Sequence, residues 1–525
     1  MWPALRAPLR AALGAALATA LVDRATHAQE AEVIEDPELA RAPTARQEPT
    51  APPASFRLEL HSRTAIDTAW QNAREEVIES TQIARFEAVY YRSEDLRFDV
   101  GLRARHYFAR READTAEGDA ERYELDVVPL AAYADATLSD GIHLRAGYQT
   151  IWLGRFDFWS ATNFLAVLDL RNGLTTMPEA LEFAQPAARL DVDLSSELTL
   201  EAVYVPFFQP HLVTIAGSDY ALLAFLDQTE PTSVSGSPAI VRAVERSQIP
   251  GVTTSGVQAL DPQPSLEHPQ GALRFSARPR GGEIGLTVGT ALERLPAFEL
   301  SAELHDVLEG PELAAFIQDP DNLGNQVALR DALVPLAAVE KPFRVSYGRF
   351  FVYSVDGALD LSPVQLGFEA AYLQNRVFNA SRPGRLPIPG TSDVGHFALR
   401  AELVEPVLVA STEAFVASAF DEPSDPARSW MLLDKGHWLR GLAAAARLTP
   451  SGIPFAFELL GLIATGKTLF LSPRVEWQAS DGLYFELGAH FLEGPKPGAL
   501  GEPDLSIGGI YDGIDQVFVG VRWIP

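Results

Sequence analysis

Between residues 96 and 108 the sequence reads LRFDVGLRARHYF, and its apolar and charged side chains alternate with a period of two. Successive side chains of a β-strand point to opposite faces, so this stretch predicts a strand with one apolar and one charged face. A soluble sheet would turn the apolar face toward a core, whereas a barrel in lipid would turn it outward and line its lumen with charges. One parity holds Leu96, Phe98, Val100, Leu102, Ala104 and Phe108, and the other holds Arg97, Asp99, Arg103, Arg105 and Tyr107.

The same period recurs from Phe56 to the C-terminus, for example over residues 142–149, 197–204, 396–403 and 483–491. Short turns, such as those at 139–141 and 480–482, alternate with long polar connections. This alternation is typical of outer-membrane barrels, which have short periplasmic turns and long outer loops. We expect the long loops at residues 110–121, 154–183, 208–268, 306–341, 376–393, 421–436 and 493–513.

The segment 282–306 decides whether the strand count is even. Its apolar residues keep one parity from Ile284 to Leu304, across Pro296, so we interpret it as one long strand with a bulge at the proline. The count is then about 18, an even number, as in bacterial single-chain barrels. The sequence therefore predicts an all-β fold, a transmembrane antiparallel β-barrel of about 16–18 strands with short periplasmic turns.

The N-terminus predicts export from the cytoplasm. Arg6 and Arg10 precede an apolar run over residues 11–22, and Ala28 offers a small residue at a cleavage site. Because this run is too short to span a bilayer, we interpret 1–28 as a signal peptide rather than an anchor. Residues 29–55 are rich in Pro, Ala and Glu and predict a disordered leader, and the barrel follows over 56–525.

Composition and the C-terminus narrow the partners. The 42 Lys+Arg against 70 Asp+Glu give a net charge of −28, which argues against nucleic acid. The absence of cysteine excludes disulfides and thiolate metal sites. The last alternating stretch, Val517 to Trp523, resembles the terminal strand that barrel-assembly machinery recognises, although Ile524 and Pro525 follow the aromatic residue.

Known catalytic and metal motifs are missing from the sequence. No histidine of the 10 lies within 30 residues of another, and neither G-x-S-x-G nor G-x-x-x-x-G-K-[ST] occurs. The stretch 319–324 begins like a calcium loop, but Leu323 replaces an oxygen ligand and Arg330 stands where the bidentate Glu belongs. We therefore expect no enzyme activity, no catalytic residues, no metal and no cofactor.

One block of sequence goes beyond a general barrel pattern. The strand end GYQTIWLGRFD over 147–157 leads to Asp169-Leu-Arg171, Met177-Pro-Glu179, Ala184-Gln-Pro186 and the strand close VPFFQP over 205–210. Over residues 140–215 this arrangement resembles the porin-like outer-membrane families of Gram-negative bacteria, with Leu153 inserted between the Trp and Gly of their strand-end motif. The resemblance implies a barrel that passes or binds a solute, and it names no substrate.

A barrel of about 18 strands leaves an aqueous channel unless a segment fills it. We expect the 154–183 loop to fold inward as a constriction, where its charges would face basic residues of the wall and orient dipolar solutes. The alternative is that this loop caps the barrel outside with solvated charges, and the 208–268 loop is a second candidate plug. The candidate loop residues are Arg155, Asp157, Asp169, Arg171, Glu179 and Glu182, and the candidate wall residues are Arg97, Asp99, Arg103, Arg105 and Arg145.

The function that these expectations favour is a porin-like channel for small polar solutes in the cell outer membrane. Its partners would be outer-membrane lipid, the solutes and the assembly machinery. Three alternatives remain: an outer-membrane barrel enzyme, a transporter of apolar compounds, which would need an apolar lumen, and a secreted soluble β-protein.

Overall fold

The computed structural model describes most of the protein after residue 53. The described residues are 54–68, 76–111, 120–156, 160–175, 181–213, 268–319, 322–335, 343–381, 388–423, 429–430, 433, 437–465, 468–494 and 515–525. The predicted signal peptide and leader lie outside them, except that Ala54 and Ser55 already belong to the first strand. Most of the second candidate plug, residues 208–268, also lies outside the described residues.

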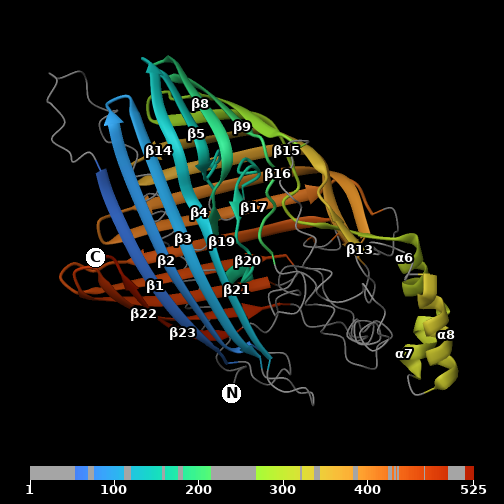
Figure 1. Cartoon of the computed structure of the whole chain (residues 1–525). Coiled ribbons are helices and arrows are strands. Elements are labelled where there is room, and N and C mark those ends of the chain that lie inside the picture. The colour runs from blue at the N-terminus through green and yellow to red at the C-terminus, as the bar shows by residue number, and fades with distance from the viewer. Residues whose placement is uncertain are drawn as a thin grey trace, which may run out of the picture.

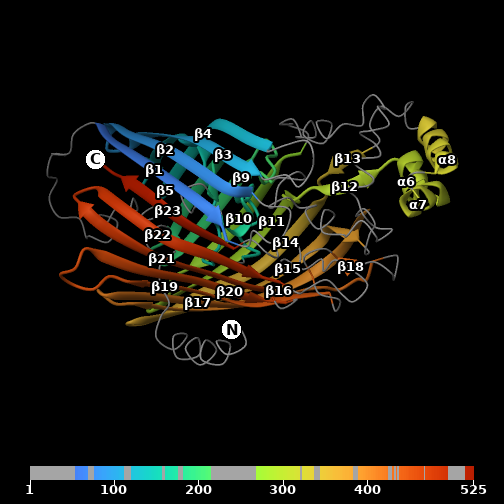
Figure 2. The same cartoon turned by 90° about the horizontal axis from the view of Figure 1, so that it is seen from below.

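One antiparallel sheet closes on itself and forms a barrel (Figures 1 and 2). It has 19 strands, of which β18 (Ser429–Trp430) is a two-residue addition to the edge of β15, so 18 strands form the ring. β23 pairs with β1 and closes it. The predicted fold class is therefore confirmed. Around the ring the strands are β1 (Ala54–Asp67), β2 (Glu76–Ser93), β3 (Leu96–Arg111), β4 (Ala120–Ser139), β5 (Ile142–Gln149), β8 (Gln185–Ser195), β9 (Leu198–Val205), β10 (Gln270–Ala277), β11 (Gly282–Leu292), β14 (Arg349–Leu361), β15 (Val364–Ser381), β16 (Ile388–Val404), β17 (Leu408–Ala419), β19 (Trp438–Leu448), β20 (Phe455–Ala464), β21 (Thr468–Ser480), β22 (Leu483–Glu493) and β23 (Gln516–Trp523).

The connections are sorted by length between the two ends of the barrel. Every turn at one end is short, from two residues at 94–95 to six at 449–454. The other end carries the long connections, although the one between β20 and β21 spans only 465–467. The predicted loop at 376–393 is shorter than expected, because β15 continues to Ser381 and β16 begins at Ile388.

The prediction of one strand over 282–306 is wrong. β11 ends at Leu292, and β12 (Ala297–Leu300) pairs with β13 (Phe343–Ser346) in a separate two-stranded sheet. The parity persists because β12 and β13 continue the β11–β14 hairpin beyond the barrel, while Pro296 has no N–H with which to continue the ladder.

Three short helices follow β12 and lie beyond the barrel (Figure 1). They are α6 (Ala302–Glu309), α7 (Pro311–Gln318) and α8 (Leu323–Leu333). Ala302 and Leu304, for which the alternating pattern predicts a strand, therefore lie in the first turn of α6 instead. No helix among the described residues is long and apolar enough to cross a membrane.

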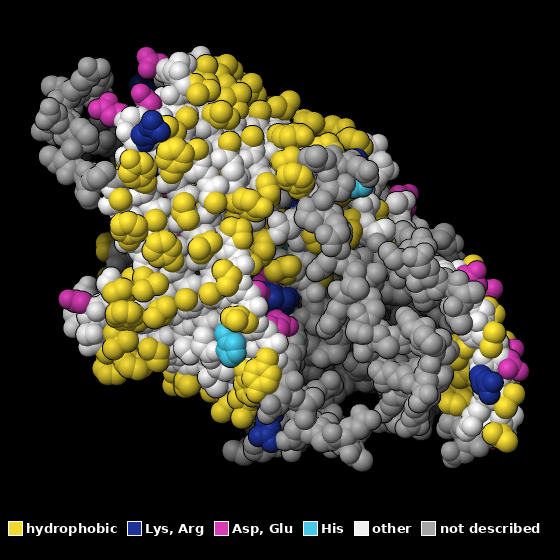
Figure 3. Space-filling view, in the orientation of Figure 1, with side chains coloured by type: hydrophobic (Ala, Val, Ile, Leu, Met, Phe, Trp, Pro, Cys, Tyr) yellow, Lys and Arg dark blue, Asp and Glu magenta, His cyan; other side chains and the backbone are white. Residues whose placement is uncertain are grey.

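The two faces of the wall are opposite in character. On β3, Val100 and Leu102 are 44% and 43% exposed, whereas Asp99, Arg103 and Arg105 are 6%, 0% and 3% exposed. Figure 3 shows the same arrangement on one side of the molecule, where hydrophobic side chains cover the outer wall strands. Large apolar side chains therefore face outward and charged side chains face the interior, which is the reverse of a soluble sheet.

The outward apolar face predicts how the protein responds to a charge at two depths. In lipid vesicles, Leu102→Arg in the middle of β3 should lower the free energy of unfolding by about 2–4 kcal/mol, because the guanidinium must enter hydrocarbon. Leu194→Arg, next to a short turn at the end of β8, should lower it by about 0–1 kcal/mol. Urea titration of both variants in the same vesicles measures the difference, and equal losses would contradict the outward orientation.

Candidate functional site

Residues 150–184 connect β5 to β8, and the described part of this connection, 150–156, 160–175 and 181–184, turns into the barrel rather than away from it. We call the described part of this connection the inner segment; it includes β6 (Val167–Leu168), the short 3-10 helix η3 (Gly173–Thr175) and β7 (Glu182–Phe183). Its backbone and side chains contact inward-facing side chains from strands far apart around the ring, and these contacts define the candidate site.

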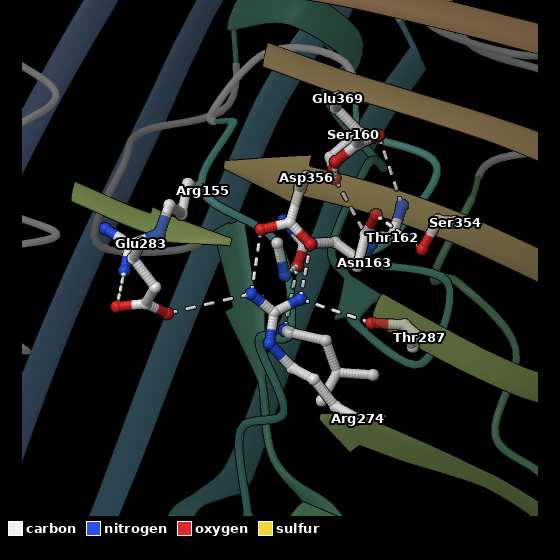
Figure 4. Close-up of polar contacts among 12 residues, drawn as sticks. Arg155, Ser160, Thr162, Asn163, Arg274, Glu283, Thr287, Ser354, Asp356 and Glu369 are labelled. Atoms are coloured by element: carbon white, nitrogen blue, oxygen red, sulfur yellow. Dashed lines mark hydrogen bonds and ion pairs between the residues drawn. The ribbon is translucent and has the colours of Figure 1, made fainter. Parts of the chain in front are cut away.

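The first anchor of the inner segment is Glu369 on β15, a carboxylate with no exposed surface (Figure 4). Ser160 Oγ donates to Glu369 Oε2 at 2.6 Å, and the backbone N–H groups of Ala161 and Thr162 donate to Oε1 at 2.6 and 3.3 Å. Thr162 Oγ1 also donates to Ser354 Oγ on β14 at 3.1 Å. Hydrogen bonds to a charged acceptor are the strong class, so one carboxylate fixes three consecutive residues.

A second group of charges lies beside this anchor (Figure 4). Arg155 of the inner segment forms an ion pair with Glu283 of β11 at 2.5 Å. Arg274 of β10 reaches both carboxylate oxygens of Asp356 on β14, at 2.5 and 2.7 Å, and lies 3.9 Å from Glu283. The bidentate pair satisfies two donors at once, which is the geometry that guanidinium groups favour.

The other end of the inner segment binds the wall at β3. Arg103 Nη2 donates to Asp169 Oδ2 at 3.3 Å, and Arg105 Nη2 donates to Asn172 Oδ1 at 2.7 Å. Arg171 donates twice to the same Asp169 carboxylate, at 2.9 and 2.6 Å, and forms an ion pair with Asp126 of β4. Arg103 and Asp169 are both buried, so these charges are not solvated outside the barrel.

Further hydrogen bonds from the wall hold the inner segment near these two anchors. Arg63 of β1 donates to Thr175 O at 2.7 Å, and Arg294, just after β11, donates to Leu165 O at 3.0 Å. Burial and the nearby charge of Arg294 lower the pKa of His211 to about 3. The ring is therefore neutral at pH 7, and its Nδ1 accepts the hydrogen bond from Leu168 N at 3.0 Å.

The two anchors lie on nearly opposite walls. In the ring order above, β3 is the third strand and β15 the eleventh, so eight positions of eighteen separate them. The eight residues from Thr162 to Asp169 are joined by seven Cα–Cα steps, which span at most about 25 Å when extended. The inner segment therefore crosses the interior from one wall to the other.

Apolar packing accompanies the first anchor. Phe156, Phe164 and Leu165 of the inner segment belong to one buried cluster with inward-facing residues of β14 to β22. Gly289 of β11 makes room for this packing, because a Cβ there would lie 2.3 Å from Phe164 Cζ. The wall residues of the cluster include Phe350, Val352, Leu373, Val394, Phe415, Leu439, Leu462 and Phe470.

Three of the predicted wall residues form a separate cluster near the short turns. Arg97 donates to Asp99 at 3.0 Å and to Asp135 of β4 at 3.2 Å, and Arg145 of β5 donates to Asp135 at 2.9 Å. These residues face the interior, but the structure gives them no contact with the inner segment among the described residues. They line the wall at a different level from Arg103 and Arg105.

The remaining predicted residues are described incompletely. Asp157 and Glu179 lie outside the described residues, and of Glu182 only the backbone, paired with Leu168, is described. Where loop and wall charges are both described, they touch directly, as Asp169 and Arg103 do. Loop and wall charges therefore form direct ion pairs in this part of the interior.

Several residues of the site were not among the predicted ones. Glu369, Arg274 and Asp356 each occupy an inward parity position, which is the signal that could have found them, but their partners depend on the register between distant strands. The same is true of a ladder of ion pairs across β19 to β23 near the short turns. It consists of Arg447, Glu458, Arg474, Glu476, Glu486 and Arg522.

Within the part of the protein that the structure describes, no group of three or more His, Cys, Asp or Glu side chains could hold a metal ion. No protein-family model matches the sequence, and no curated protein matches it. The charged residues of the interior are arginines and carboxylates, and they contact one another and nearby hydroxyl groups.

Solved structures of similar arrangement include three proteins of low sequence identity. The Salmonella typhi OmpF complex with daunomycin matches 90% of this chain and 97% of that chain at 8% identity, with a TM-score of 0.38. Acinetobacter baumannii OccAB1 matches 90% and 96% at 7% identity, with a TM-score of 0.44, and OccAB3 matches 90% and 99% at 9% identity, with a TM-score of 0.41. Likenesses at this level do not assign a family or a function to the protein.

The first anchor predicts the effect of removing one carboxylate. Glu369→Ala leaves three donors of residues 160–162 without their acceptor, so hydrogen exchange at the amides of Ala161 and Thr162 should accelerate by about tenfold or more. Glu405→Ala, in an exposed turn at the other end of the barrel, is the matched control and should change neither amide. Unchanged protection in a folded Glu369→Ala variant would show that the inner segment is held elsewhere.

The second anchor predicts a dependence on acid. Burial raises the pKa of Asp169, but the hydrogen bonds and charge of Arg171 outweigh it and hold the pKa below the ordinary 3.8. The carboxylate therefore contributes stability above pH 3.8 and loses it as the pH falls through the lower folded value. The difference in unfolding free energy between wild type and Asp169→Asn should shrink from pH 5 to pH 2, which urea titration at each pH measures; a difference that stays constant over this range would contradict the prediction.

Proposed function

We propose that this protein is an outer-membrane channel for small polar solutes, in which the inner segment narrows the lumen. The observation that supports this most strongly is the reversal of the wall, with apolar side chains outward and charged ones inward on a closed ring. A ring of about 18 strands is wider than its own side chains can fill, so a lumen of this size conducts unless a segment closes it. We further propose that lipid contacts the outward face and that assembly machinery recognises β23.

The charges of the interior suit a polar solute that exchanges hydrogen bonds as it moves. Guanidinium groups such as Arg171 and carboxylates such as Asp126 alternate around the inner segment and along the wall. A solute with hydroxyl, amide or charged groups finds hydrogen-bond donors and acceptors along the lumen. These replace the hydrogen bonds to water that the solute loses where the lumen is narrowest. Selectivity would then come from the residues beside the inner segment.

Two alternatives fit the interior less well. A transporter of apolar compounds needs an apolar surface open to the solute, but the apolar wall from β14 to β22 is buried in one cluster with the inner segment. A secreted soluble protein would expose to water the outward residues of β3, β11 and β23, a continuous apolar belt that soluble monomers do not carry.

The proposal predicts a conductance that the anchors control. Purified protein in planar lipid bilayers should give stepwise current, and a variant with both Glu369→Ala and Arg103→Gln should give larger steps, because the inner segment no longer crosses the lumen. Single-channel recording measures the step size. Glu405→Ala is the control and should conduct as the wild type does.

Two outcomes would contradict this proposal. A protein that inserts with an intact fold but carries no current would not be an open channel. Steps of unchanged size in the anchor variant would show that residues outside the inner segment set the narrowest point.

A further inference from the structure

A groove of about 730 Å³ lies on the barrel wall across β11, β14, β15, β16, β17 and β19. Most of its lining side chains belong to the outward parity, and nearly all of the lining surface is apolar. Aromatic rings stand along it: Tyr353 stacks on Tyr372 with 6.3 Å between ring centroids, and Tyr372 stacks on Phe420 at the same distance. Trp438 closes the groove at β19.

Small residues make the wall hollow at this place. Register pairing aligns Tyr372, Gly395, Ser418 and Trp438 in one row across β15, β16, β17 and β19. Gly395 and Ser418 stand between the rings of Tyr372 and Trp438. The Phe420 ring lies over Gly395, where a Cβ would be 2.8 Å from its Cζ, and Ala370 lies in the next row beside Phe397. The depression therefore follows from the sequence at specific register positions and is not a gap between strands.

The outward-facing row that contains Ala370 and Phe397 ends at the guanidinium-bearing residue Arg440 on β19. It aligns Leu286, Val355, Ala370, Phe397, Val416 and Arg440 across the same six strands. Arg440 is exposed on the outward face, because its neighbour Leu439 points inward and is 1% exposed. Asp393 on β16 also has outward parity, but its carboxylate accepts hydrogen bonds from Tyr372 Oη and Asn375 N.

The row runs from the rim of the wall to its middle. The carbonyl of Arg440 accepts a hydrogen bond from Thr465 N, immediately after the last residue of β20, at the end with the long connections. Leu286, at the other end of the row, is the fifth residue of the 11 in β11. The six strands of the row span about 24 Å from the first to the last, measured across the strands.

We propose that this groove binds one acyl chain of an anionic phospholipid, whose phosphate is not compensated by a cationic head group and lies beside Arg440. The proposal rests on the membrane location in the proposed function and adds a specific lipid site to it. Guanidinium groups recognise phosphate through paired donors, and the apolar groove between aromatic rings takes the acyl tail. The direction of the groove, from a charged rim toward the middle of the wall, matches a lipid whose head lies at the interface.

Native mass spectrometry of the full-length protein with added phosphatidylglycerol or phosphatidylcholine tests this site. Wild type should bind one phosphatidylglycerol more tightly than phosphatidylcholine. Arg440→Gln should weaken phosphatidylglycerol binding about fivefold, equivalent to about 1 kcal/mol, and leave phosphatidylcholine unchanged. Ala370→Phe fills the groove and should weaken both lipids, whereas Ala146→Phe, on the outward face of β5, should weaken neither.

The outcomes separate this inference from the channel proposal. Equal binding of both lipids by wild type, an unchanged preference in Arg440→Gln, or normal binding by Ala370→Phe would overturn the lipid site. Dimers or larger assemblies that Ala370→Phe disrupts would also overturn it, because the groove would then be an interface between copies. Insertion and conductance of the same preparations test the channel independently, since the substituted residues Arg440 and Ala370 have outward parity and neither belongs to the anchors of the inner segment.

Discussion

The pairing of β23 with β1 is the interaction on which the rest of the structure depends. Eight register pairs, from Leu60 with Trp523 to Asp67 with Gln516, join the two ends of the sheet. Without them, two edge strands would expose unpaired N–H and C=O groups, which hydrocarbon does not tolerate. Closure also creates an interior, and only an enclosed interior can place charged residues from strands far apart in the sequence within contact distance.

Once the ring is closed, mutual pairing makes the charged interior stable. A buried guanidinium such as Arg274 is costly by itself, and Asp356 compensates for it with two hydrogen bonds. Similar pairs occur at Arg103 with Asp169 and along β19 to β23. Because each pair joins different strands, the pairs also favour one register of the sheet over others.

The inner segment uses the interior as a scaffold on two sides. Glu369 fixes one part of it through backbone and hydroxyl donors, and Arg103 and Arg105 fix another through side chains. The first anchor lies in the large apolar cluster, whereas the second combines ion pairs with a small apolar cluster of Val128, Val167 and Phe183.

The sequence by itself determined the strands, the sorting of turns and loops and the even count, and it placed Arg103 and Arg105 on the charged face of their strand. These follow from a period of two and from turn residues, which are local properties of the sequence. It left open whether the loop that carries Asp169 and Arg171 folds inward or caps the barrel outside. It misassigned residues 293–306, because parity persists into β12 although the barrel strand has ended.

Only the tertiary structure decided which charges meet. The contact between Ala161 and Glu369 joins residues 208 positions apart, and that between Arg103 and Asp169 joins residues 66 apart. Such contacts depend on the closure of the ring and on the register of every strand between the partners. No local pattern encodes the closure of the ring or the register between distant strands. The alternating sequence therefore predicts which strand side chains face the interior, but not which partner each of them contacts.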